Sequence, residues 1–315
     1  MKHFTLIKTN FSHHVSMDLY HEFEKNIIHK KNWEVVNGIG SFGAKIIRQL
    51  LKVFPPLKIP IKKSENYVVI GFQKEKFFPY FHYNVNLKVL WMYDAWEPLF
   101  PEIETAIKQY GINLLLTASK QSAAFFNDLA LENFEAKWIP EAVDVSNYKF
   151  IDYNSRKIDV LQLGRKWNEY HDKIKVIEND FTYVYEKKVG EIIFKTREDF
   201  LTGLANSKIS ICVPSDITHP DRTGKISTLT NRYLQSMASK CLILGKLPYD
   251  MAYLFDYNPI IEIDERDSVG QIKFLLNNYN DYIPLIEKNY QTVKNFHNWN
   301  DRIVQIENCI SEFKK

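Results

Sequence analysis

The residues best suited to chemistry gather in one polar segment, Pro214 to Tyr233. It is rich in Thr, Ser and Gly, contains the cations Arg222 and Lys225, and leads into a pattern of helical period. The residues that can begin this helix are Thr228, Thr230 and Asn231. A helix start offers N–H donors and a partial positive charge, so it can bind a phosphate. The alternative is an ordinary surface loop before a capped helix.

A second group of candidate residues follows the apolar run Ile158 to Leu163, which has the composition of a buried strand. Gly164, Arg165 and Lys166 come directly after it. Glycine lets the backbone approach a ligand closely, arginine can bind two phosphate oxygens in a fork, and lysine adds a point charge. This pattern favours a diphosphate site, and the alternative is a pair of solvated surface cations.

Asp94 is the candidate catalytic carboxylate. It follows the apolar run Leu87 to Tyr93 and precedes a helix predicted from about Leu99. A carboxylate at a strand end can accept a hydroxyl proton as a general base, and the ring of Trp96 beside it is of a type that stacks on sugars. Asp94 can equally cap the following helix. The sequence leaves both interpretations open.

A glycine pattern near the N-terminus predicts a dinucleotide site only in part. Gly38, Gly40 and Gly43 form GxGxxG after a possible strand, Trp33 to Asn37. The next strand, Tyr67 to Phe72, ends without the acidic residue that would hold a ribose hydroxyl. A dinucleotide-dependent oxidoreductase is therefore one alternative function, and a plain flexible glycine loop is the other interpretation.

The segment Lys45 to Lys63 interleaves cations with apolar residues. Such a basic amphipathic pattern is typical of contact with an anionic membrane surface, or of a core-facing helix with solvated lysines. No stretch approaches the roughly 18 uncharged apolar residues of a membrane span. We expect a cytoplasmic protein, with peripheral membrane contact as an option.

Composition excludes several classes of protein. The 315 residues are 45% hydrophobic, enough for about two domains, and the net charge of +3 is too small for a nucleic-acid-binding footprint. Cys212, Cys241 and Cys309 lie far apart, which predicts neither a disulfide framework nor a zinc site. There is no Asp-x-Asp triplet to hold a divalent ion on a diphosphate. We therefore expect no metal and no nucleic-acid partner.

Short apolar runs alternate with helical segments along the whole chain, which favours an α/β protein with parallel sheets. The two series of runs are separated near Asp144 to Lys157, where polar residues cluster without periodicity. Two sheets are therefore expected, with ligands at the carboxyl ends of their strands.

Five segments, taken in their order along the chain, resemble the GT-B glycosyltransferases of the group-one nucleotide-sugar-dependent superfamily, including its spore-protein-like branches. They are Val89 to Asp94, Asn113 to Ser119, Trp138 to Asp144, Leu163 to Lys166 and Gln235 to Ile243.

The resemblance implies two Rossmann-like domains that face a central cleft. Residues 1–145 would bind the acceptor, residues 146–295 the nucleotide sugar, and residues 296–315 would form a helix that packs back on the first domain. The implied reaction is metal-independent transfer of a sugar from a nucleotide-diphosphate sugar to a glycan, lipid-linked or protein acceptor, as in polysaccharide biosynthesis. The donor is a substrate, so no cofactor is implied.

The resemblance also assigns roles to single residues. Asp94 would be the base or would orient the acceptor, and Gln235 would contact the ribose. The residues that would bind the diphosphate are Gly164, Arg165, Lys166, Arg222, Lys225, Thr228, Thr230 and Asn231. The chain departs from the family where two glutamates separated by seven residues are expected, since Ser227 and Gln235 stand there. A catalytically inactive sugar-binding relative is therefore a further alternative.

Overall fold

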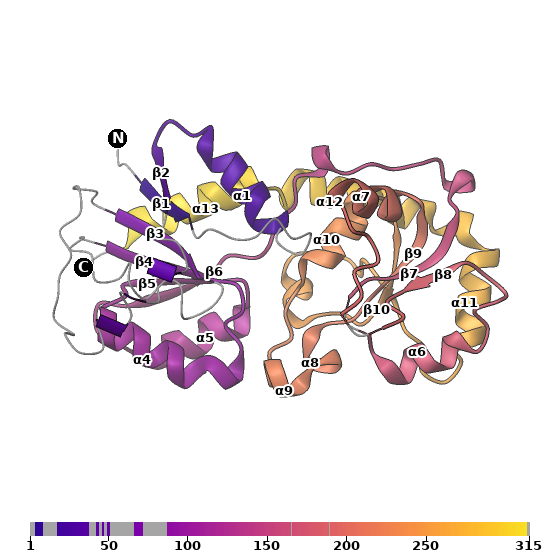
Figure 1. Ribbon diagram of the computed structural model, residues 1–315, viewed down its shortest axis with the longest axis horizontal. Coiled ribbons are helices and arrows are strands. Elements are labelled where there is room, and N and C mark those ends of the chain that lie inside the picture. The colour runs from indigo at the N-terminus through magenta and orange to yellow at the C-terminus, as the bar shows by residue number, and fades with distance from the viewer. Residues whose placement is uncertain are drawn as a thin grey trace. The chain divides into compact units, whose positions relative to one another are not determined.

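The computed structural model describes residues 4–8, 18–37, 66–71, 87–164, 166–188 and 190–313, together with residues 42, 43, 46, 49 and 50. The chain forms two compact units (Figure 1), of which one contains the chain up to Pro140 and again from Arg302, and the other contains Glu141–Asp301. The passage between them comes at Pro140 rather than near residue 145. The N–H of Val143 already donates to the carbonyl of His297, 3.0 Å away in the second unit.

The first unit is built on a six-stranded sheet in the order β2-β1-β3-β4-β5-β6, with every pair of neighbours parallel. Its strands are β1 (Phe4–Lys8), β2 (Trp33–Asn37), β3 (Asn66–Gly71), β4 (Leu87–Met92), β5 (Leu114–Thr117) and β6 (Glu135–Trp138). The bounds of β2, β3 and β4 confirm the strands expected at Trp33 to Asn37, Tyr67 to Phe72 and Leu87 to Tyr93 to within about one residue. A parallel sheet needs both faces covered, which explains why β4 and β5 are almost entirely apolar and buried.

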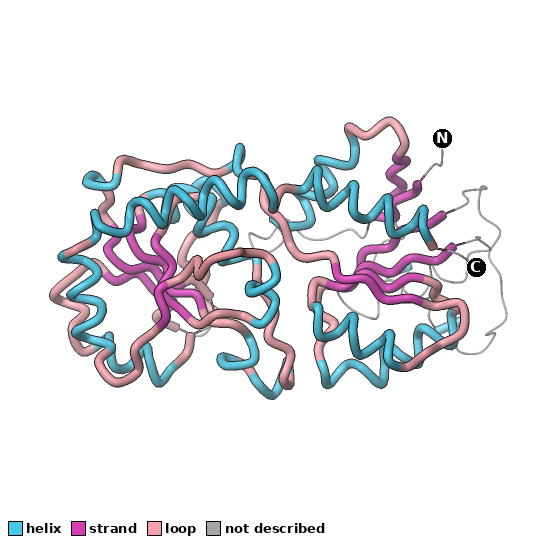
Figure 2. The backbone as a smooth tube through the Cα atoms, turned by 180° about the vertical axis from the view of Figure 1, so that it is seen from behind, coloured by secondary structure: helices cyan, strands magenta, loops and turns pink. Residues whose placement is uncertain are grey.

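Helices cover both faces of this sheet, as the tube in Figure 2 shows. They are α1 (Asp18–Ile28), α4 (Phe100–Tyr110), α5 (Lys120–Asp128) and α13 (Trp299–Glu312), the last of which begins in the second unit. Phe23 of α1 packs edge-on against Trp91 of β4, with ring centroids 4.5 Å apart. The C-terminal helix is fixed to this unit by Glu307, which accepts hydrogen bonds from Asn32 and from the Trp33 indole.

The second unit has a five-stranded sheet in the order β11-β10-β9-β7-β8, and all of its pairs are parallel. Its strands are β7 (Ile158–Gln162), β8 (Tyr183–Tyr185), β9 (Ser207–Cys212), β10 (Leu242–Gly245) and β11 (Ile261–Glu262). Its helices are α6 (Asn168–Lys175), α7 (Arg197–Ala205), α8 (Ser215–Thr218), α9 (Pro220–Thr223), α10 (Asn231–Ala238), α11 (Ser268–Asn277) and α12 (Ile283–Phe296).

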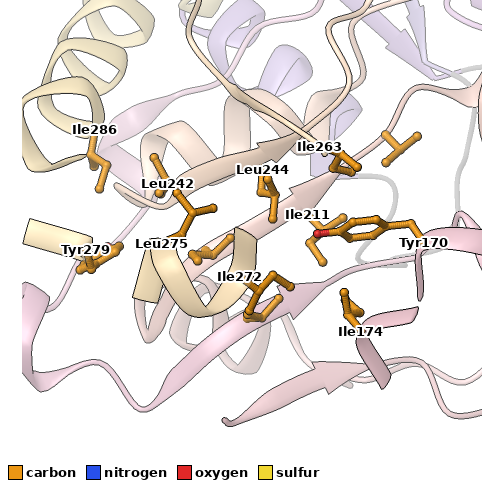
Figure 3. Packing of buried hydrophobic residues seen from close by; sticks show 13 residues of the cluster. Tyr170, Ile174, Ile211, Leu242, Leu244, Ile263, Ile272, Leu275, Tyr279 and Ile286 are labelled. Carbon is orange, nitrogen blue, oxygen red and sulfur yellow. The ribbon is translucent and has the colours of Figure 1, made fainter. Parts of the chain in front are cut away.

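Side-chain alternation along β9 assigns its two faces. Ile209 and Ile211 join the hydrophobic cluster under α6 and α11, where Tyr170, Ile174, Ile272 and Leu275 meet them (Figure 3). Ser210 and Cys212 point to the opposite face, because successive strand residues alternate. There the hydroxyl of Ser236 on α10 donates to Ser210, 2.8 Å away. The sheet therefore lies between α6 with α11 on one face and α10 on the other.

No helix within the described residues is long and apolar enough to cross a bilayer. Most of the basic segment from Lys45 to Lys63 lies outside those residues, so both interpretations of it stay predictions.

Candidate functional site

The strand order of the second unit marks the edge where a ligand can bind. After β7 the chain forms β8 on one side, then crosses to β9 on the other, and Val160 of β7 lies opposite Ile209 of β9. In open α/β sheets the loops after two such strands separate and leave a crevice at their carboxyl ends. Gly164 follows β7 at this point, and Asp216 follows β9.

The start of α10 is attached to the same edge of the sheet by Tyr233. Its hydroxyl lies 2.9 Å from the carbonyl oxygen of Cys212, at the end of β9, and 2.7 Å from that of Lys246, just after β10. Burial raises the pKa of Tyr233 well above its usual value, so the hydroxyl keeps the proton it donates. The first turn of α10 is thus held at the carboxyl ends of two strands.

The side chain at the helix start does not cap it. Thr230 is the N-cap residue in extended conformation, yet it accepts no hydrogen bond from the first turn. In the part of the chain that the structure describes, Thr230 Oγ1 and Asn231 Oδ1 are buried and have no hydrogen-bond partner. Thr228 is used elsewhere, since its hydroxyl donates to Asp250 at 2.8 Å. The first-turn donors of α10 are therefore not satisfied by the capping side chain, as an anion site requires.

Arg232, which the sequence analysis did not single out, brings a cation to this helix start. It is the second residue of α10, and its Nη2 would lie only 2.6 Å from a Cβ added to Gly164. Burial lowers the pKa of the guanidinium, although an arginine stays charged at neutral pH. A cation in the first turn opposes the helix dipole, so an anion at this point would stabilise it. That unfavourable position is the signal by which the sequence could have identified Arg232.

We predict that Gly164→Ala weakens binding of nucleotide diphosphates and lowers the free energy of unfolding by about 1–2 kcal/mol. Gly164 has φ +67, where an L-residue is disfavoured, and the new Cβ would displace the Arg232 guanidinium. Gly111→Ala is the matched control, because Gly111 has φ +60 and nothing within 4 Å of an added Cβ. Calorimetric titration and thermal melting of both variants measure the difference. Equal nucleotide affinity in both would contradict the role of Gly164.

The other expected diphosphate ligands differ in their surroundings. Lys166 Nζ donates to the carbonyl of Glu186 at 2.7 Å and lies over the Tyr185 ring. Arg222 and Lys225 are exposed, and Gln235 on α10 is buried. Arg165 lies outside the described residues. The ligand roles of these residues stay predictions.

Asp94 lies in the first unit, one residue after Tyr93 at the carboxyl end of β4, and is half-buried. It does not occupy a helix cap, because the N-cap residues of the two following helical segments are Trp96 and Leu99. The capping interpretation is therefore wrong, and the catalytic one stays a prediction. Trp96 is only 5% exposed, so its ring is packed in the protein rather than offered for stacking on a sugar.

The glycine pattern follows an edge strand. Gly38 and Gly40 lie outside the described residues, but β2, which precedes them, is the outermost strand of the six-stranded sheet. In that sheet the order in which successive strands are added reverses between β1 and β3, and dinucleotides bind at such a switch point. The strand order thus does not favour a dinucleotide site after β2.

Among the described residues, no group of three His, Cys, Asp or Glu side chains could hold a metal ion. Cys212 and Cys241 are buried, and burial raises the pKa of both thiols.

Comparison with known proteins gives structural matches only. No protein-family model and no curated protein matches the sequence. HepE from Anabaena in complex with UDP matches with a TM-score of 0.60 at 10% identity, over 99% of this chain and 100% of that chain. Sucrose-phosphate synthase from Thermosynechococcus elongatus matches with a TM-score of 0.62 at 9% identity, over 99% of each chain.

An alpha-glucosyltransferase in complex with UDP and a 13-mer DNA containing an HMU base matches with a TM-score of 0.62 at 12% identity, over 98% of this chain and 99% of that chain. At such identities the likeness establishes the fold. The chain has the α/β GT-B fold expected from its sequence, with two Rossmann-like units.

Proposed function

We propose that this chain is a glycosyltransferase that takes a sugar from a nucleotide-diphosphate sugar and transfers it without a metal ion. The acceptor would be a glycan, a lipid-linked saccharide or a protein. The observation that carries the proposal is the position of the Arg232 guanidinium beside Gly164. Arg232 belongs to the first turn of α10, which the Thr230 side chain does not cap. A cation and helix donors at one sheet edge suit the diphosphate of a leaving nucleotide.

The proposed mechanism needs only groups of this chain. As the bond between the sugar and the diphosphate breaks, negative charge grows on the diphosphate oxygens, and the guanidinium with the α10 N–H groups would stabilise it. The acceptor oxygen would form the new bond to the anomeric carbon of the sugar, and Asp94 would accept the proton that this hydroxyl loses. The solved structures support this proposal, since HepE is crystallised with UDP and, separately, with UDP-glucose.

We predict that a nucleoside diphosphate raises the melting temperature of the protein and that EDTA does not abolish the effect. Ligand at about 100 times its dissociation constant adds about 2.7 kcal/mol to stability. UDP, GDP and ADP, their glucose conjugates, NAD and FAD would be compared in thermal melts with and without excess EDTA. Loss of nucleoside-diphosphate binding in EDTA, with recovery in Mn²⁺ or Mg²⁺, would show that a metal neutralises the diphosphate.

The same panel separates the alternatives. Stabilisation by NAD or FAD alone would favour the oxidoreductase. Stabilisation by a nucleotide sugar without hydrolysis or transfer would favour an inactive relative, the alternative raised by Ser227 and Gln235 in place of two glutamates.

A further inference from the structure

The structure supplies a carboxylate beside the position where the sequence lacks one. Ser227 stands where the resemblance places an acidic residue, and a hydroxyl carries no charge. In the folded unit the Ser227 hydroxyl forms a hydrogen bond with the carboxylate of Asp216, which belongs to the short helix α8. The two residues are brought together by the turn of the chain through α8 and α9.

We propose that Asp216, positioned by Ser227, binds hydroxyl groups of the sugar in the nucleotide-diphosphate donor and so determines which sugar is accepted. This inference rests on the proposed function, because it assigns the sugar end of the same donor. It adds a residue that neither the motif spacing nor the resemblance indicated.

The hydrogen bonds around Ser227 fix the direction of its single proton. Ser227 Oγ lies 3.4 Å from the backbone nitrogen of Tyr249, whose N–H it accepts, so its own proton is available for Asp216. The Ser227 hydroxyl therefore positions the carboxylate of Asp216, as a group that selects among ligands must be positioned.

One oxygen of this carboxylate is left for a ligand. Asp216 Oδ1 is buried and has no hydrogen-bond partner among the described residues. A buried acceptor without a partner lowers stability, which makes a donor from outside the chain favourable at this point. Sugar hydroxyls are such donors, and their hydrogen bonds to a carboxylate are strengthened by its charge.

The position and charge of Asp216 fit the sugar rather than the diphosphate. Asp216 lies shortly after Cys212, the last residue of β9, and the carbonyl of Cys212 accepts a hydrogen bond of 2.9 Å from the Tyr233 hydroxyl on α10. The carboxylate therefore lies near the first turn of α10, where the diphosphate is proposed to bind. A carboxylate would repel phosphate oxygens but attract the hydroxyls of the group attached to them.

Folding itself gains nothing from this charge. Burial raises the pKa of Asp216 in spite of the hydrogen bond from Ser227, so the ionised form costs stability at neutral pH. Residues that carry a function often lower stability in this way. We therefore expect Asp216→Asn to melt at or above the wild-type temperature at pH 7.

The test compares two ligands in four proteins by calorimetric titration. The ligands are the nucleoside diphosphate among UDP, GDP and ADP that binds the wild type best, and its glucose conjugate. The proteins are the wild type, Asp216→Asn, Ser227→Ala and the control Asp221→Asn, which removes an exposed carboxylate on α9. Asp216→Asn should weaken binding of the nucleotide sugar about 10-fold and leave the affinity for the free diphosphate unchanged. Ser227→Ala should show a smaller loss of the same selectivity, and Asp221→Asn none.

The outcomes separate the two proposals. Equal losses for both ligands in Asp216→Asn, or no loss for either, would overturn the role of Asp216 and leave the nucleotide site standing. Failure of every diphosphate to bind the wild type would overturn the proposed function and this inference with it. Ser227→Glu added to Asp216→Asn should restore the selective part of the affinity. A double variant that binds the free diphosphate normally but regains no selectivity would contradict the assignment.

Discussion

Asp94→Asn should lower turnover by about 10²–10⁴-fold while the affinity for the donor stays unchanged, because a positioned general base contributes on this scale. Asparagine keeps the shape of the side chain and removes only its basicity. Asp94 occupies no helix cap, since Trp96 and Leu99 hold those positions, so a loss of turnover would not come from a lost N-cap. Initial rates at saturating donor and acceptor provide the measurement.

The matched control for this experiment is Glu97→Gln. Glu97 is an exposed carboxylate in the short helical turn that follows Asp94. The substitution Glu97→Gln therefore removes the same charge from the same part of the first unit. We expect near-normal turnover from this control. Near-normal turnover by Asp94→Asn as well would remove Asp94 from the mechanism and favour proton transfer to the leaving diphosphate.

Arg232→Ala should weaken binding of nucleoside diphosphates by about 10- to 100-fold, the range of a hydrogen bond to a charged group. Arg232→Lys should recover only part of the affinity, because an ammonium keeps the charge and loses the planar fork. Burial already lowers the pKa of this guanidinium, so the alanine variant should not lose stability through the missing charge. Calorimetric titration with and without added salt measures the effect.

Arg266→Ala serves as the control, because Arg266 is an exposed arginine of the same unit. It should bind nucleoside diphosphates as the wild type does. Unchanged affinity in Arg232→Ala, with a normal melting temperature, would mean that the guanidinium lies outside the site. The diphosphate would then depend on Lys166 or on the first-turn donors of α10.

The sequence alone determined which segments form strands and which form helices. The runs Leu87 to Tyr93 and Ile158 to Leu163 became β4 and β7, with a shift of no more than a residue at either end. Buried parallel strands are nearly continuous apolar runs, and helices have a different period, so both can be recognised locally. Gly164, at the end of β7, was identified for the same local reason.

The interactions within the candidate site were decided by the tertiary structure. The contact between Arg232 and Gly164, and the bond between Ser227 and Asp216, join residues from separate elements. Which elements meet depends on the order of strands in the sheet, and no local pattern records that order.

The same reason explains why two residues expected as possible helix caps, Thr228 and Asp94, do not cap a helix. Thr228 is a suitable N-cap by type, but its hydroxyl is bound by Asp250, which is buried and distant in sequence. Asp94 is suitable too, but the helical turns after β4 begin at later residues. Residue type and spacing therefore determined which groups are available for chemistry. The pairing of β9 beside β7 in the sheet decided which of these groups lie together. Strand crossing brings distant segments to one edge, and burial there fixes the partners of each polar atom.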